Sequence, residues 1–315
     1  MNSMVLVLIF GTLSLAAPLI AAAYGGMFSE RSGVVNIGLE GMMTAGAFGC
    51  AGAISFLGDT GLYGHYVVLI GILVGCLFGF LFGLLHAWLS ITYKVDQIIS
   101  GTIINIAALA IFVYSTKIIF KQANTPMIMS SPITFFHGKL TLISLSILFL
   151  SVFFYYLLFK TKWGTHVLSV GENPSAADAM GINVAKVRYQ AVLLSGTLGG
   201  LGGAAIVLNT TSNFSGVTVA GSGFIALAVL IFGRHNPFGV VLAGIIFGFF
   251  KNLGIIIQTM DPSLLPKFIR FLSDVPQVAY QMLPYVITII VLVIFSRGNR
   301  MSMEALGTPY DKEVR

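Results

Sequence analysis

The sequence has very little charge. Only 9% of its 315 residues are Asp, Glu, Lys or Arg, whereas 57% are hydrophobic. Soluble domains carry about 25% charged residues, so this composition excludes a soluble protein and indicates an integral membrane protein. Helical spans of ~20 apolar residues are expected. No polar stretch is long enough for a separate soluble domain, so residues 1–315 are predicted to form one transmembrane domain.

Cysteine and N-terminal positive charge are also scarce. The two cysteines, Cys50 and Cys76, lie inside apolar runs and are interpreted as small buried hydrophobic residues, not as a disulfide or metal pair. No Lys or Arg precedes Arg31, whereas a cleavable signal peptide normally carries a positive n-region. We therefore expect the first apolar run to be kept as a span.

Motifs for nucleotide binding, metal binding and catalysis are missing from the sequence. No Gly-x4-Gly-Lys-Ser/Thr occurs, and the glycine-rich run 196–203 lies in an apolar span. The histidines have no metal-ligand spacing, and no paired Asp, His or Glu is predicted at span depth. The net charge of +6 fits an excess of Lys and Arg on cytoplasmic loops better than a nucleic-acid surface. The chain is predicted not to be an enzyme, and to bind neither a cofactor nor nucleic acid.

What the sequence does contain is a series of apolar runs that predicts an all-α, polytopic transmembrane bundle of eight to ten spans. The runs cover residues 4–23, 34–57, 66–91, 97–120, 140–159, 188–208, 217–233, 238–257 and 276–296. Runs 34–57 and 217–233 are interrupted by glycine and polar residues, so each also fits a discontinuous or re-entrant helix. Glycines recur every four residues within 71–83 and 196–203, which predicts close helix packing.

The distribution of Lys and Arg predicts the orientation of the chain. If the loop 160–187 is cytoplasmic, eleven Lys and Arg residues lie inside and five outside. The tail 297–315 is then cytoplasmic and the N-terminus is external.

The loop 160–187 is unusually polar for this chain. Within it, residues 174–180 are predicted to form a short helix, with Pro174 in its first turn and Gly181 suited to ending it. A short helix held at the membrane surface between two spans is a good shape for docking a soluble partner. The loop is therefore a candidate coupling element.

Polar side chains at span depth form two candidate stripes. Asn36, Glu40 and Thr44 recur every four residues, as do Gln97 and Asn105 around Gly101. Such groups are rare in membranes unless they face a bundle interior or a cavity. One reading is a pathway for a polar solute. The other is that these groups satisfy an interrupted backbone or link helices. His86 and Trp88 are interpreted as packed or interfacial residues.

Four segments resemble motifs of one family, the permease subunits of bacterial ATP-binding cassette importers for branched-chain amino acids, simple sugars and nucleosides. The segments are residues 30–43, 95–105, 175–181 and 232–239, in the family's order. Residues 175–181 look like the coupling motif Glu-Ala-Ala-x3-Gly, with Ser175 where Glu is usual. Residues 30–43, with Asn36 and Glu40, look most like nucleoside-importer permeases.

The resemblance implies a type II-like importer fold and a set of partners. These are a second permease subunit (a non-identical sister is expected), cytoplasmic ATPases that use ATP with Mg, an external substrate-binding lipoprotein and the lipid of the bacterial cell membrane. It also implies that the coupling segment contacts the ATPase. The residues implied in that contact are Asn173, Ser175, Ala176, Ala177, Asp178 and Gly181.

Other functions stay open at this point. The same machinery carrying a simple sugar or a branched-chain amino acid is the nearest alternative to nucleoside import. A stand-alone secondary transporter or channel would need coupling-ion carboxylates at span depth, and Glu40 alone makes a poor case. A membrane scaffold would leave the polar loop unexplained.

Overall fold

The computed structural model describes residues 2–130, 132–135, 140–259, 286 and 304–311, and these are mostly helical. The helices are α1 (Asn2–Arg31), α2 (Leu39–Asp59), α3 (His65–Ala87), α4 (Gln97–Phe120), α5 (Leu142–Lys160), α6 (Lys162–Glu172), α7 (Pro174–Ala179), α8 (Val184–Ile206), α9 (Ser222–Phe232) and α10 (Pro237–Thr259). The π-helical turns η1 (Trp88–Thr92) and η2 (Val207–Thr211) extend α3 and α8. Strands β1 (Thr134–Phe135) and β2 (Leu140–Thr141) form a small antiparallel hairpin.

The helices of membrane length match the predicted apolar runs. Within the described residues, seven helices are long and apolar enough to cross a membrane: α1, α2, α3, α4, α5, α8 and α10. The shorter α9 falls in an eighth predicted run. The prediction of an all-α, polytopic bundle is therefore confirmed. The ninth predicted run, 276–296, lies outside the described residues apart from residue 286, as does most of the tail 297–315.

The two runs that also fitted a discontinuous or re-entrant helix, 34–57 and 217–233, are not continuous helices in the structure. In the run 34–57 the helix begins only at Leu39, and residues 32–38 form turns and irregular chain. In the run 217–233, α9 has only 11 residues and follows an irregular segment, 212–221. Gly221, the residue before α9, has a φ of 81°, in the left-handed region that favours glycine.

Glycine seams hold the centre of the bundle together, as the four-residue spacing predicted. A Cβ atom on Gly196 of α8 would lie 2.5 Å from the carbonyl oxygen of Gly79 on α3. A Cβ on Gly75 would lie 2.8 Å from the Gly46 carbonyl of α2. Backbones this close allow α2, α3 and α8 to gain dispersion contacts along their length, which is the main attraction available between apolar helices in lipid.

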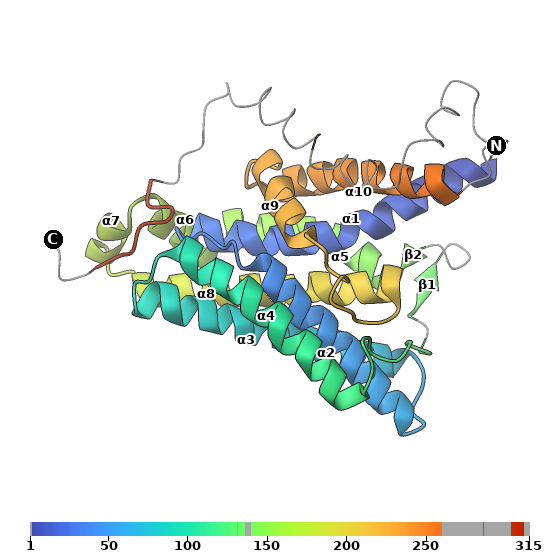
Figure 1. Ribbon diagram of the computed structural model, residues 1–315. Helices are drawn as coiled ribbons and strands as arrows, with labels where there is room; N and C mark the ends of the chain where they lie inside the picture. The colour runs from blue at the N-terminus through green and yellow to red at the C-terminus, as the bar shows by residue number, and fades with distance from the viewer. Residues whose placement is uncertain (1, 131, 136–139, 260–285, 287–303, 312–315) are drawn as a thin grey trace.

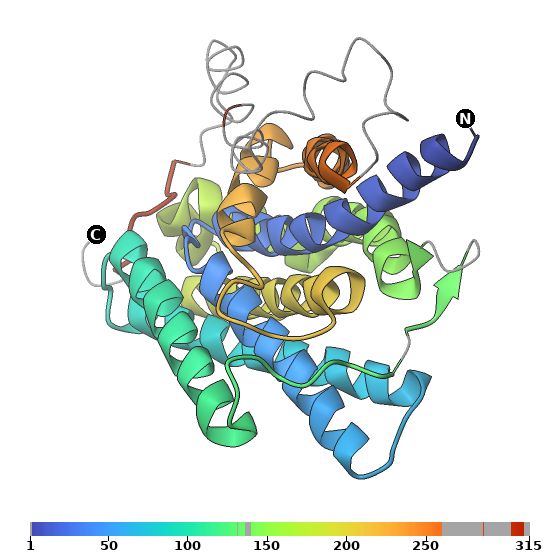
Figure 2. The ribbon, with the colours of Figure 1, turned by 45° about the vertical axis from the view of Figure 1, so that its right-hand side comes forward.

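The helices are arranged around α1 and α8, as the two ribbon views show (Figures 1 and 2). α10 runs alongside α1, whereas α2 and α3 pack on α8, and α4 lies at the edge of the bundle against α2. α6 and α7 form a small unit at the end of the bundle where α1 finishes, and the N-terminus lies at the opposite end (Figure 1). The described tail segment 304–311 lies at the α6–α7 end.

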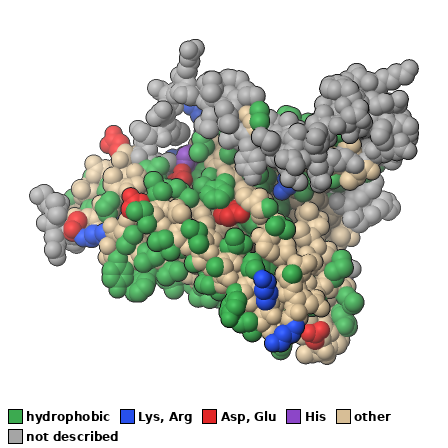
Figure 3. Space-filling model, viewed as in Figure 1, with side chains coloured by type: hydrophobic (Ala, Val, Ile, Leu, Met, Phe, Trp, Pro, Cys, Tyr) green, Lys and Arg blue, Asp and Glu red, His purple; other side chains and the backbone are tan. Residues whose placement is uncertain are grey.

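The outer surface is largely apolar. Hydrophobic side chains cover much of the face in Figure 3, and charged side chains on it are few. α4 shows the pattern most clearly, because it buries one narrow stripe, including Ser100, Ile104 and Ala108, and exposes most of its other side chains. Such a surface suits contact with lipid or with another apolar chain.

Candidate functional site

The segment between α1 and α2, together with the first turn of α2, has backbone groups without helical partners, and polar side chains of α4 bind them. Gln97 accepts a hydrogen bond from the Val35 amide (2.7 Å). Asn105 accepts one from the Gly41 amide (2.7 Å) and donates one to the Ile37 carbonyl (3.0 Å). Both side chains belong to α4. An unpaired backbone group at membrane depth costs several kcal/mol, so these contacts allow the interruption to exist.

Asn36 lies in this interrupted segment and is fully buried. Its side-chain amide donates hydrogen bonds to Ser195 Oγ on α8 (2.8 Å) and to the sulfur of Met42 (3.4 Å). Its Oδ1 atom has no hydrogen-bond partner among the described residues. Because α2 begins after Asn36, the predicted helical stripe through Asn36, Glu40 and Thr44 is wrong for Asn36.

Glu40 joins α2 to α9. Its two carboxylate oxygens accept hydrogen bonds from the amides of Gly221 (2.7 Å) and Gly223 (2.6 Å), at the N-terminus of α9. α9 has no side-chain cap of its own, so Glu40 supplies one from 181 residues away. A negative charge is favourable beside the free amides at a helix N-terminus. A Cβ on Gly223 would lie 2.5 Å from the Glu40 Cα, so the close approach depends on glycine.

The other polar side chains complete one connected cluster. His86, on α3, contacts the Val35 carbonyl through Nε2 and Ser100 Oγ through Nδ1, each at 3.0 Å. Thr44 donates to the carbonyl of Glu40 (2.8 Å), one turn earlier on its own helix. We call residues 35–41, with His86, Gln97, Asn105 and Ser195, the polar junction.

The structure brings four predicted pathway residues, Asn36, Glu40, Gln97 and Asn105, to one place, and Thr44 adjoins them. Asn36 binds the side chains of Ser195 and Met42, but the other side-chain hydrogen bonds of these residues go to backbone groups. This agrees with the alternative in which polar side chains satisfy an interrupted backbone. Their role in passing a solute stays a prediction. Sequence reasoning missed the contribution of Ser195 and gave His86 no partner. The only available signal was a polar residue inside an apolar run.

The second candidate site is the α6–α7 unit. Asn173 caps α7, accepting a hydrogen bond from the Ala176 amide (2.9 Å), and Pro174 occupies its first turn. Gly181, with a φ of 84°, donates its amide to the Asp178 carbonyl (2.9 Å). The Ile182 amide reaches the Ala177 carbonyl (3.0 Å), which completes a Schellman motif. The predicted short helix and its glycine stop are confirmed. α6 was not predicted, because its polar sequence looked like a loop.

The surface of this unit is suited to contact with another molecule. Ala177 is buried, whereas Met180 is 83% exposed. Beside Met180 lies a groove of about 490 Å³ between α6 and the start of α8. Its walls include Trp163 and Gln190, which are joined by a 2.9 Å hydrogen bond from the indole nitrogen. An exposed methionine next to an open groove is typical of adaptable protein contacts.

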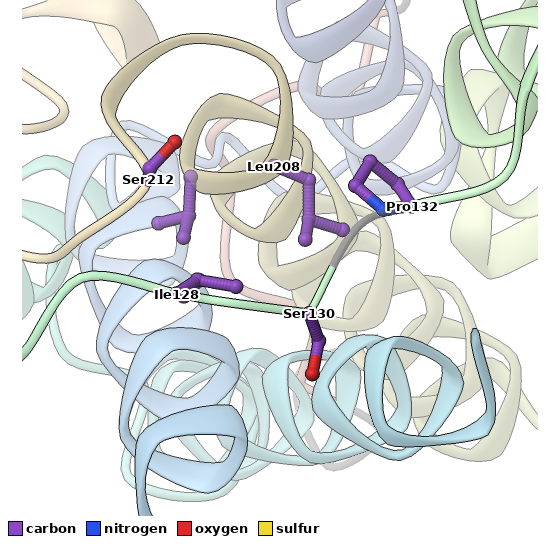
Figure 4. Close-up of a pocket in the computed structure, with 6 residues that line it drawn as sticks. Ile128, Ser130, Pro132, Leu208 and Ser212 are labelled. Atoms are coloured by element: carbon purple, nitrogen blue, oxygen red, sulfur yellow. The ribbon is translucent and has the colours of Figure 1, made fainter. Parts of the chain in front are cut away.

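A smaller pocket lies near the other end of α8. It has a volume of about 140 Å³ and is lined by Ile128, Ser130, Pro132, Val207, Leu208 and Ser212 (Figure 4). The Ile128 amide donates to the Ser212 carbonyl (2.8 Å), so two loops are joined at its edge. The lining of this pocket carries no charged side chain.

Comparison with known proteins identifies the family. The structure is that of a multi-pass helical membrane protein. Residues 8–292 match the family described as "Branched-chain amino acid transport system / permease component", and the chain belongs to this family.

Two relatives align with almost the whole chain. It is 38% identical to the nucleoside ABC transporter permease protein NupC of Lactococcus lactis, with 97% of each chain aligned. It is 39% identical to the guanosine ABC transporter permease protein NupQ of Bacillus subtilis, with 98% of each aligned. A shorter match, 28% identical over 33% of this chain and 27% of the relative, is to the nucleoside ABC transporter permease protein NupB of L. lactis.

Proposed function

We propose that this chain is a permease subunit of an ATP-driven importer that carries nucleosides across a bacterial cell membrane. The observation that carries the proposal is full-length similarity to NupC and NupQ, whose names specify nucleoside and guanosine transport. Full-length alignment at this level supports a shared machine, and the agreement of two relatives on cargo class supports nucleosides over sugars and amino acids.

The α6–α7 unit is the proposed docking site for the ATPase. Its helix α7 is short, capped at both ends and presented at one end of the bundle, so it can be held rigidly against a partner. The contact residues are Asn173, Ser175, Ala176, Ala177, Asp178 and Gly181. ATP, with Mg, is consumed by that partner, and this chain converts the movement of α7 into movement of its spans.

The remaining partners follow from the same proposal. The similarity of this chain to both NupB and NupC supports pairing with a non-identical sister permease. An external lipoprotein delivers the substrate at the end opposite α7, and the tail 297–315 lies in the cytoplasm with α6 and α7. The eleven-to-five bias of Lys and Arg supports this orientation.

The polar junction is the proposed solute contact of this subunit. Asn36 supports the proposal, because its unpartnered Oδ1 can accept a hydrogen bond from a nucleoside hydroxyl once the junction opens. Glu40, Thr44, Gln97 and Asn105 complete the polar surface. Asn36→Ala and Glu40→Ala should reduce uptake while leaving the complex assembled, and normal uptake by both variants would exclude this assignment.

The function is tested by uptake of labelled adenosine or uridine into vesicles that contain this chain, its sister permease and their ATPase. We expect uptake that requires ATP and is competed by other nucleosides. ATP-driven uptake of a simple sugar or a branched-chain amino acid would support the proposed importer and exclude nucleosides as its substrate. Uptake of any solute without ATP would favour a secondary transporter or channel and exclude the proposed importer.

A further inference from the structure

The described part of the tail, residues 304–311, is bound at the α6–α7 end of the bundle (Figure 1). The Ala305 amide donates a hydrogen bond to the carbonyl of Gly171, at the end of α6 (3.3 Å). The Gly307 amide donates one to the carbonyl of Gly33, in the turn after α1 (3.1 Å). This tail segment therefore bridges α6 and the α1–α2 turn.

Arg188 fastens the tail segment from the first turns of α8. Its side chain is only 2% exposed. Nε donates to the Ser32 carbonyl (3.2 Å), and Nη1 donates to the Thr308 carbonyl (3.1 Å). One guanidinium thus holds the α1–α2 turn and the tail together. The planar guanidinium of arginine carries several N–H donors in fixed directions and can bind two such carbonyls at once, whereas the ammonium of lysine acts as a single point charge.

Glycines make the approach of these segments close. A Cβ on Gly33, whose φ is 89°, would lie 2.9 Å from Nη2 of Arg188 and 3.2 Å from the carbonyl oxygen of Ala305. A Cβ on Gly171 would collide with the carbonyl of Arg31, at the end of α1. α6, the α1–α2 turn and the tail are therefore in direct backbone contact, with no layer of side chains between them, and α8 joins them through the Arg188 side chain.

The tail segment also reaches the chain that leads into α4. Lys94 Nζ lies 2.5 Å from Asp311 Oδ2. Lys94 precedes Gln97, which binds the Val35 amide of the polar junction. The tail thus contacts both segments that meet in the junction, the α1–α2 turn and the start of α4.

We propose that Arg188 and the tail segment form a joint that transmits movement of the α6–α7 unit to the polar junction. Arg188 is a positioning residue in this joint. The inference rests on the proposed function, in which an ATPase moves α7. Without the joint, α6 and α7 stay attached through α5, α8 and the contact of Gly171 with the end of α1, but Arg188 and the tail no longer fasten residues 32–41 to α6 and α8 as one body.

The test compares ATP hydrolysis and nucleoside uptake in the same vesicles, containing the full complex. Arg188→Met should leave hydrolysis in place and lower uptake per ATP hydrolysed by about fivefold to tenfold, a range typical of coupling between sites. Arg188→Lys should not restore the uptake per ATP hydrolysed, because lysine keeps the positive charge but lacks the planar guanidinium that binds both carbonyls. Lys117→Met, which removes an exposed cation at the far end of α4, is the matched control.

Two further variants leave Arg188 in place, in case its replacement prevents folding. Ala305→Pro removes the amide that binds Gly171, and a stop codon after residue 303 removes the tail segment. Both should reproduce the fall in uptake per ATP. An unchanged ratio in these variants would overturn the proposal, as would a proportional loss of hydrolysis and uptake.

A cross-link tests whether the tail works while bound. In a background with Cys50→Ala and Cys76→Ala, Lys94→Cys and Asp311→Cys are joined by a short bismaleimide. Retained coupling after cross-linking is expected, and its loss would mean that the tail must leave, which contradicts a transmitting joint. Failure of the proposed function is distinguishable, because it would show as uptake without ATP dependence in the wild-type complex.

Discussion

At the residue scale, the polar side chains inside this bundle serve mainly the backbone of other elements. Gln97, Asn105 and Glu40 all bind amides that the interrupted segments leave free. In a medium without water, a free amide is costly, so each of these side chains stabilises a break in a helix. The same break also places polar groups where a solute could meet them.

Glu40 offers the sharpest test at this scale. Glu40→Ala would leave the Gly221 and Gly223 amides without their carboxylate, and hydrogen bonds to charged groups contribute about 1.5–3 kcal/mol each. We expect a clear fall in the thermal unfolding midpoint in detergent. Asp59→Asn, an exposed acid at the other end of α2, is the control and should unfold like the wild type. Equal midpoints for Glu40→Ala and wild type would show that the carboxylate does not hold α9.

Asn105 tests the link between α2 and α4. Asn105→Leu removes both the acceptor for Gly41 and the donor to Ile37, so two backbone groups lose their partners at about 1–3 kcal/mol each. The variant should unfold at a lower temperature than the wild type. Thr102→Val, about one turn away on the exposed face, loses only a hydrogen bond to its own helix and should be nearly neutral. Similar unfolding of the two variants would contradict the assigned role of Asn105.

At the element scale, the helices divide into continuous spans joined by glycine seams and interrupted elements joined by polar side chains. α3 and α8 belong to the first kind, since Gly79 and Gly196 bring their backbones together. α9 belongs to the second, since its N-terminus depends on Glu40. The continuous spans can form a rigid frame, whereas the interrupted elements have contacts that can exchange with water or solute.

The surroundings of each glycine predict different effects for two glycine substitutions. Gly196→Ala would place a methyl group 2.5 Å from the Gly79 carbonyl, so α3 and α8 must separate and stability should fall. Gly52→Ala, in α2, meets nothing within 4 Å and should be neutral or stabilising, because alanine favours a helix by ~1 kcal/mol over glycine. Thermal unfolding in detergent measures both. Equal effects would mean that helix propensity, and not close packing, governs these positions.

At the scale of the whole molecule, the sequence predicted what local rules control. The bounds of α4, the capped helix α7 and the glycine seams all follow from patterns within a few residues. The sequence did not predict the cap that Glu40 gives to α9 or the hydrogen bond from Arg188 to the tail, because these two contacts join residues that are 181 and 120 positions apart. Local sequence patterns carry no information on contacts between distant positions, and a single polar residue does not indicate which residue it will contact.

The placement of the chain in the membrane gives the last prediction. α7 and the described tail lie at one end of the bundle and the N-terminus lies at the other (Figure 1). The orientation of the bundle in the membrane therefore determines the side on which each of the three is found. In a background with Cys50→Ala and Cys76→Ala, Ser175→Cys reports on α7 and Leu62→Cys on the loop after α2, and both positions are exposed. The excess of Lys and Arg at the α7 end predicts a cytoplasmic position for it. A membrane-impermeant maleimide should label Leu62→Cys in intact cells, and Ser175→Cys only in inverted vesicles. Labelling of Ser175→Cys from outside would reverse the orientation and place α7 beyond the reach of any ATPase.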